Sequence, residues 1–251
     1  ISALAPAGKA GTWLIDPIYN IRIVDGLGVT NNQDAPGFEP NGDDSIIGAT
    51  LIVNRLNAGT NVTISTTSAF GPTIGTGTQA GNISVEGAIQ KTAGGPAKLT
   101  LNAVGAVDLQ ASIAGAPLPS NLSVEINAGA GGVTQNALAV LAAKDLTITT
   151  IDGGSVTLNG AVLADTLSVT VGFNNSPNDV GSVTINSAFN EIGTIKGIQS
   201  MQGITLMDKD TDANGLIIDG MIRGGGFADY DVILRTKGNF TINPGSKIFS
   251  N

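Results

Sequence analysis

A three-residue phrase, apolar–hydroxyl–apolar, recurs along this chain and constrains its fold more than any other feature. Successive copies begin 16 to 24 residues apart. Alternation with a period of two predicts a short strand in each copy, and a repeat of roughly 20–29 residues is typical of one solenoid coil. We therefore expect an all-β chain forming a right-handed parallel β-helix. The copies are Val62–Ile64, Ile83–Val85, Leu99–Leu101, Leu122–Val124, Leu146–Ile148, Leu167–Val169, Val183–Ile185 and Ile204–Leu206.

Further strand phrases lie between these copies, so each coil should hold two or three short strands. Helices are nearly excluded, because the one run with helical character, Ala137–Ala143, is short, lacks an amphipathic stripe and fits a wall strand better. An antiparallel sandwich is the alternative, although its strands usually recur every 8–12 residues. The additional phrases are Val156–Leu158, Leu216–Ile218, Val232–Leu234 and Phe240–Ile242.

Asparagine often follows a strand phrase directly, which predicts corners between strands. Asn tolerates the left-handed conformation, and its side chain can bond local backbone or an Asn one coil away. Stacked Asn corners should result. The residues concerned are Asn102, Asn127, Asn159, Asn186 and Asn243.

The repeat weakens toward both ends of the chain. We expect residues 1–50 to form an N-terminal flank, with strands at 12–15 and 20–24 and a polar loop over 25–44, and residues 51–251 to form the β-helix. Flank and helix should make one continuous domain. The irregular ends, including a polar loop at 208–214, should act as caps or joints, because end coils expose unpaired strand edges.

Composition excludes several functions. The chain has no Cys and no His, so it has no disulfide, no thiolate metal site and no Ser-His or Cys-His nucleophile. Its net charge of −8 argues against nucleic acid, which requires clustered basic residues. No apolar run reaches the length of a membrane-spanning helix, so membrane insertion is not expected.

One segment of the chain resembles a phrase of a known protein family: Gly11-Thr12-Trp13-Leu14-Ile15-Asp16-Pro17. This phrase, with the coils behind it, resembles giant exoproteins similar to filamentous haemagglutinin, which are adhesins exported by two-partner secretion. The resemblance implies an extracellular or bacterial cell-surface segment, structural or adhesive, within a fibre or biofilm matrix. The family's Asn-Pro-Asn-Gly and Asn-Pro-Asn-Leu phrases are missing, so we expect a downstream or processed piece. Trp13 should anchor the first coil.

A partial calcium motif precedes the strand phrase Leu216–Ile218. Carboxylates and an amide alternate before Gly215, as in loops that fold around Ca²⁺, but Met221 occupies the position of the usual bidentate Glu. The alternative interpretation is a solvated acidic turn. The expected Ca²⁺ ligands are Asp208, Asp210, Asp212, Asn214 and Asp219.

Acidic pairs offer a weaker case for catalysis. Asp43-Asp44 or Asp229 with Asp231 could serve a glycosidase, and Arg223, Arg235 and Lys237 are the local group for a lyase. Aromatic residues for stacking sugars are few. We therefore expect no enzyme, and expect partners that are neighbouring copies or domains end to end, or host or matrix glycans and proteins; a polysaccharide-acting β-helix enzyme is the alternative.

Overall fold

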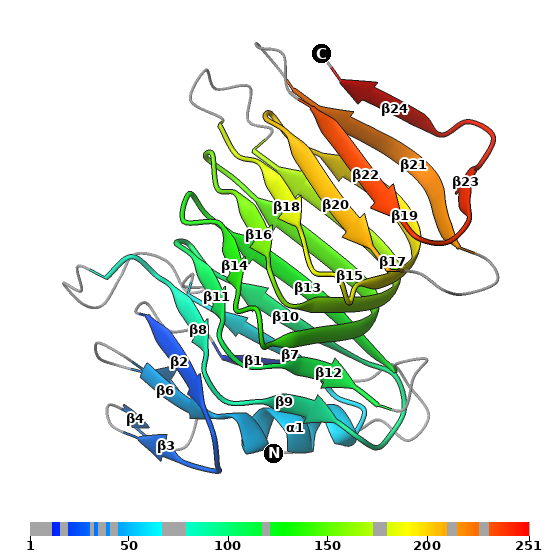
Figure 1. Ribbon diagram of the computed structural model, residues 1–251. Helices are drawn as coiled ribbons and strands as arrows, with labels where there is room; N and C mark the ends of the chain where they lie inside the picture. Colours follow the sequence, from blue (N-terminus) through cyan, green and yellow to red (C-terminus); the bar gives the residue numbers. More distant parts are fainter. Residues whose placement is uncertain are drawn as a thin grey trace.

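The chain forms a parallel β-helix of about eight turns, seen in the computed structural model as a stack of strands (Figure 1). This confirms the predicted fold class. Nearly every strand pair is parallel, which rules out the antiparallel sandwich; the exceptions among the described pairs are β3 with β6 and β4 with β5. The structure describes residues 12–15, 20–30, 33–34, 39–40, 45–66, 79–116, 121–172, 180–209, 215–225 and 231–250, and only their backbone at 12–15, 29–30, 33–34 and 39–40.

Two long sheets run along the stack. Sheet A has twelve strands in the order β1-β7-β10-β13-β15-β17-β19-β21-β23, with β9, β12 and β24 paired beside this path. Its strands are β1 (Thr12–Ile15), β7 (Asn61–Ser65), β9 (Ile89–Lys91), β10 (Ala97–Asn102), β12 (Ile113–Gly115), β13 (Leu122–Ala128), β15 (Val140–Thr150), β17 (Ala161–Val171), β19 (Glu191–Gln199), β21 (Leu216–Gly224), β23 (Phe240–Ile242) and β24 (Lys247–Ser250).

Sheet B has ten strands in the order β22-β20-β18-β16-β14-β11-β8-β2-β6-β3. Its strands are β2 (Ile21–Val24), β3 (Val29–Thr30), β6 (Ser45–Gly48), β8 (Ile83–Val85), β11 (Val107–Leu109), β14 (Val133–Gln135), β16 (Val156–Leu158), β18 (Val183–Ile185), β20 (Ile204–Asp208) and β22 (Val232–Thr236). A separate pair joins β4 (Gln33–Asp34) to β5 (Glu39–Pro40).

The recurring phrases belong to both sheets. Five of the eight copies lie in sheet A and three in sheet B. Coils contribute one strand to sheet A and one to sheet B, as the additional strand phrases predicted. A third wall is made by β9, β12 and the first residues of β15, which are paired in register, so the strand expected within 137–143 is confirmed from Val140 onward.

The core is a set of stacked apolar columns inside the walls. Ile64, Leu101, Ile126, Ile148 and Val169 pair in register on successive coils and are fully buried. The hydroxyl residue of each phrase points outward because successive side chains of a strand alternate between faces. The prediction that the apolar residues of each phrase face the core is thus confirmed.

Corners between sheets bring neighbouring backbones close together, which explains the many glycines. A Cβ on Gly129 would lie 1.7 Å from the carbonyl oxygen of Val104 on the preceding coil. The Asn corners stack as predicted at one place, where Asn127 Nδ2 donates to Asn102 Oδ1 at 2.7 Å. Among the described residues, none of these Asn residues has a positive φ, and Asp152 is the one non-glycine residue that does. Asn102, Asn127 and Asn243 form side-chain hydrogen bonds between coils.

The N-terminal flank is built into the stack. β1 pairs with β7, and β2 pairs with both β6 and β8, so flank strands extend sheets A and B. The side chain of Trp13 lies outside the described residues, and its predicted anchoring stays a prediction.

A helix, α1 (Ala49–Asn57), lies at this end, and the expectation that helices are nearly excluded was wrong here. Ala49, Ile52 and Leu56 are buried, at a spacing of three and four that places them on one helical face. The helix packs against β6, β7, β9 and β10, and Figure 1 shows it across the N-terminal end of the stack. It replaces a strand in the third wall and covers the first coil.

The C-terminal end has no such cover among the described residues. Phe240, Ile242 and Ile248 pair in register with the buried residues Leu216, Ile218 and Ile222, so they face inward. They are nevertheless 43%, 49% and 38% exposed. The last coil therefore presents core-type side chains to solvent.

Candidate functional surface

The outer face of sheet B carries a column of hydroxyl groups. Thr134, Thr157, Thr184 and Thr205 occupy the same register position on four successive strands. Strand spacing within a sheet is about 4.8 Å, so the column is a regular line of methyl and hydroxyl groups. Such a line can form many weak polar contacts with an extended ligand.

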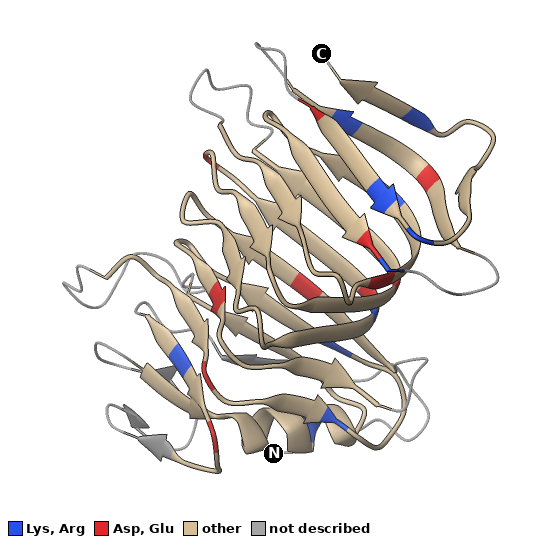
Figure 2. Cartoon of the chain, viewed as in Figure 1, with Lys and Arg blue, Asp and Glu red and all other residues tan. Residues whose placement is uncertain are grey.

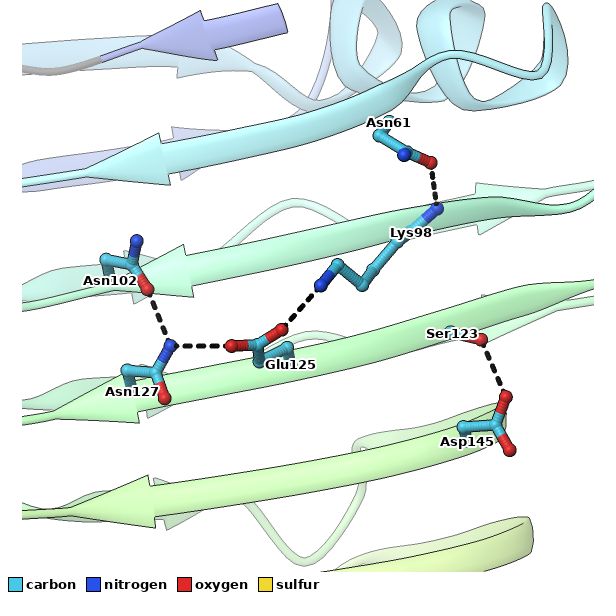
Figure 3. A network of polar contacts seen from close by, with 7 residues as sticks. All are labelled: Asn61, Lys98, Asn102, Ser123, Glu125, Asn127 and Asp145. Atoms are coloured by element: carbon cyan, nitrogen blue, oxygen red, sulfur yellow. Dashed lines mark hydrogen bonds and ion pairs between the residues drawn. The ribbon is translucent and has the colours of Figure 1, made fainter. Parts of the chain in front are cut away.

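Sheet A carries a network of polar side chains that link coils (Figure 3). Lys98 Nζ lies 2.6 Å from Glu125 Oε2, one coil farther along. Asn127 Nδ2 donates to Glu125 Oε1 at 3.2 Å as well as to Asn102. The hydrogen bonds from Lys98 and then Asn127 hold the pKa of Glu125 below its usual value. The network ties neighbouring coils together from outside.

A second carboxylate on sheet A is shared between three coils. Asp145 accepts a hydrogen bond from Ser123 Oγ at 3.0 Å on one side and from Thr166 Oγ1 at 2.9 Å on the other. Its oxygens therefore already have protein donors, which is the arrangement of a structural tie rather than of a general base.

Three ion pairs share a direction along the stack. Arg22–Glu86, Lys98–Glu125 and Lys196–Asp219 each place the base on one coil and the acid on the next coil toward the C-terminus, at 2.5, 2.6 and 2.5 Å. Arg22 and Lys196, respectively, lower the pKa of Glu86 and Asp219 chiefly through these hydrogen bonds. A longer pair, Lys209–Glu191 at 3.9 Å, has the reverse order.

A buried polar tie joins three coils near the C-terminal third. Asn190 is fully buried; its Oδ1 accepts from the Val162 N–H, and its Nδ2 donates to the Met207 carbonyl. Asp208 is also buried and accepts from the Ile192 N–H at 3.1 Å. No local pattern in the sequence signals this tie, because it depends on which residues of three coils come into register.

The expected calcium ligands divide into two groups. Asp210, Asp212 and Asn214 lie outside the described residues. Asp208 forms the buried tie, and Asp219 is engaged by Lys196 and by Asn243 Nδ2 at 3.0 Å. Within the described residues, no cluster of three or more acidic side chains could hold a metal ion.

The candidate catalytic residues that the structure describes are not gathered at one place. Asp43, Asp44 and Asp229 lie outside the described residues, and Asp231 is exposed immediately before β22. Arg223 and Arg235 lie on strands of different sheets, A and B, and each follows an inward-facing apolar residue. The group suggested for a lyase therefore does not share one strand or one sheet.

Lys91, at the end of β9, is a buried cation that sequence reasoning missed. The residue is only 2% exposed, and its Nζ donates to the carbonyl oxygens of Ala93 and Gly94 at 2.5 and 3.4 Å. Burial lowers the pKa of the Lys91 ammonium. Its carbonyl partners belong to the adjoining turn, so Lys91 closes this turn beside α1.

No known family model, curated protein or solved structure matches this chain. In the part of the chain that the structure describes, no helix is long and apolar enough to cross a membrane.

Proposed function

We propose that this chain is a structural and adhesive shaft segment of a large secreted bacterial surface protein, located outside the cell. The observation that carries the proposal is the stack itself: two sheets continue through all coils, and polar side chains on their outer faces bind one another across coils. Such a rod resists bending because each coil is bonded to both neighbours. The phrase Gly11–Pro17, which resembles haemagglutinin-like exoproteins, supports the same role.

Adhesion would use the hydroxyl-rich outer faces. In the threonine column on sheet B, Thr157, Thr184 and Thr205 can donate and accept hydrogen bonds along a glycan or a matrix protein. The Thr134 hydroxyl already donates to Asp108 Oδ1 at 2.9 Å, so it can only accept. Binding through many weak contacts suits attachment to a repetitive matrix.

The adhesive part can be tested by replacing Thr134, Thr157, Thr184 and Thr205 together with Val. The shape of Val is close to that of Thr and its strand preference is high, so the stack should keep its fold while it loses the hydroxyl column. Adhesion to immobilised glycans and matrix proteins should fall several-fold. Matched replacement of the sheet A residues Thr147 and Thr149 shows whether any loss is specific to sheet B. Unchanged binding in both variants would remove adhesion from the proposal and leave the shaft role.

A polysaccharide-acting enzyme is the second candidate, because many such enzymes use a parallel β-helix. The described acids favour it less, since Glu125, Asp145 and Asp219 are each held by protein donors. Incubation with acidic and neutral polysaccharides should release no reducing ends and no unsaturated products. Turnover that is abolished by Asp43→Asn or Asp231→Asn would replace the shaft proposal with the enzyme.

Calcium binding by the 208–214 loop is also proposed, with Asp210, Asp212 and Asn214 as ligands. Its support is the sequence pattern before Gly215. Because a ligand that binds only the folded state stabilises it, excess Ca²⁺ should raise the melting temperature and a chelator should lower it. Identical melting curves under both conditions would leave the solvated acidic turn.

A further inference from the structure

We infer that the outer face of sheet B is an ice-binding surface, a second function that goes beyond the proposed shaft role and does not depend on it. Beside the threonine column, this face carries a second column of amide side chains. Each amide stands two residues after the Thr or Asp of its own strand, so both side chains point outward. The amide column consists of the exposed residues Gln110, Asn136, Asn159 and Asn186.

Most side chains of the two columns have no hydrogen-bond partner among the described residues. At one end of the face, Thr134 donates to Asp108 and Asn136 accepts from the Leu138 N–H. The hydrogen bonds of the others therefore go to the surrounding water. The residues whose side chains bond no described residue are Thr157, Thr184, Thr205, Asn159 and Asn186.

The pairing of sheet B turns the two columns into a lattice. Its strands pair residue for residue, without a register shift, from β8 to β22. Sheet A, by contrast, shifts register between β17 and β19 and between β19 and β21. Neighbouring strands lie about 4.7–4.9 Å apart, and residues two apart on a strand lie about 6.6–6.8 Å apart. Because Thr side chains are stiff at χ1, the hydroxyl groups keep these spacings.

Ice has nearly the same spacings. A tetrahedral lattice built from O–H···O hydrogen bonds of about 2.8 Å places equivalent oxygens about 4.5 Å apart in one direction and about 7.4 Å apart in the perpendicular one. Along the threonine column the mismatch adds up to about 1 Å over three intervals, which small rotations of the side chains can absorb. Water molecules bound to the two columns are therefore arranged much as in a layer of ice.

The face is also uncharged in its middle. The single outward position of each of the described strands β14, β16 and β18 is a threonine. Figure 2 shows no acid or base on these three strands, although the whole chain has a net charge of −8. Placing a charged group against ice would remove part of its hydration, which is unfavourable. A neutral face therefore fits a neutral crystal, and these strands offer no outward aromatic ring on which a sugar would stack.

The test measures ice growth in solutions of the full chain and of two lysine variants. Thr184→Lys places a charge in the middle of the threonine column. Thr147→Lys is the matched control, because it makes the same change at an exposed sheet A threonine that also stands between two buried apolar residues. The parent and Thr147→Lys should produce faceted ice crystals and a freezing point below the melting point. Thr184→Lys should lose most of this gap.

Melting curves of both variants check that the stack is folded. Thr184→Ser keeps the hydroxyl group but frees its rotation, so it should reduce the gap by a smaller amount, and it tests the same position if the lysine variant unfolds. Round crystals and no gap with the parent would overturn the inference, as would equal losses in the two lysine variants. Adhesion to immobilised glycans without any effect on ice would also overturn it and leave the adhesive role in place. Polysaccharide turnover, by contrast, would contradict the shaft role without changing ice growth.

Discussion

Apolar residues face the inside of the stack at both ends of the molecule, but they are buried at the N-terminal end and partly exposed at the C-terminal end. At the N-terminal end, Ile21, Ile23, Val62 and Ile64 are fully buried beneath flank strands and α1. At the C-terminal end, equivalent positions in β23 and β24 are about two-fifths to one-half exposed. A solenoid coil buries its apolar side chains only when a neighbour covers them, so burial here is a property of the stack and not of the strand.

The largest difference in the free energy of unfolding should come from the same substitution made at two inward positions of sheet A, one in the middle of the stack and one at its C-terminal end. Leu101→Asp places an unpaired carboxylate between two coils and should cost several kcal/mol, about the whole stability of an ordinary domain. Ile242→Asp places the same group at the open end, where water reaches it, and should cost far less. Denaturant unfolding of both variants measures the difference; equal losses would mean that the C-terminal end is not open.

Removing apolar contact from the cap should have the next largest effect. Ile52→Ala deletes side-chain atoms that are fully buried between α1 and the first coil, and should cost roughly 2–4 kcal/mol. Asn54→Ala, on the exposed side of the same helix, is the control and should be nearly neutral. If both variants unfold at the same denaturant concentration, α1 does not close the stack.

Removing a basic side chain from the middle of the stack or from its last coil should give a smaller difference in the free energy of unfolding. Lys98→Met removes the partner of Glu125 and should cost at most about 1 kcal/mol, because the pair is partly exposed. Arg235→Met, in the last coil, should leave the free energy of unfolding unchanged. A loss at Arg235 that matched the loss at Lys98 would show that the last coil already pairs its charges.

Lowering the pH should reduce the stability that the network of Lys98, Glu125 and Asn127 contributes, by a still smaller amount. The pKa of folded Glu125 lies below its ordinary value of 4.5, so its contribution is complete above that value and is lost as the pH falls through the folded pKa. In Glu125→Gln the free energy of unfolding should be lower by about 0.5 kcal/mol at neutral pH and equal to the parent's in strong acid. A difference that persists at low pH would assign the effect to packing rather than to charge.

The sequence predicts the repetitive part of this fold well because one local rule, alternation around a hydroxyl residue, specifies both the strand and its inward face. Leu101 and Val169 can be assigned to the core by this rule alone, and both are fully buried. The helix α1 was missed, although Ala49, Ile52 and Leu56 have helical spacing, because its β-branched residues resemble those of the strands.

The cross-coil contacts could not be predicted, since they depend on register. Asn190 meets Val162 and Met207 only because coil lengths vary in a particular order, which short phrases do not encode. The one-way placement of Arg22–Glu86 and Lys98–Glu125 has the same origin. Corner lengths between the strands therefore determine the polar surface.

In the part of the chain that the structure describes, the stack is covered at its N-terminal end and uncovered at its C-terminal end, and hydrogen exchange along the unmodified chain measures this difference. Amides of β2, β8 and α1 should exchange slowly, as those of the central strands do, while β22, β23 and β24 should exchange much faster because one edge and the apolar floor meet water. Protection in the last three strands equal to that in the centre would contradict the account.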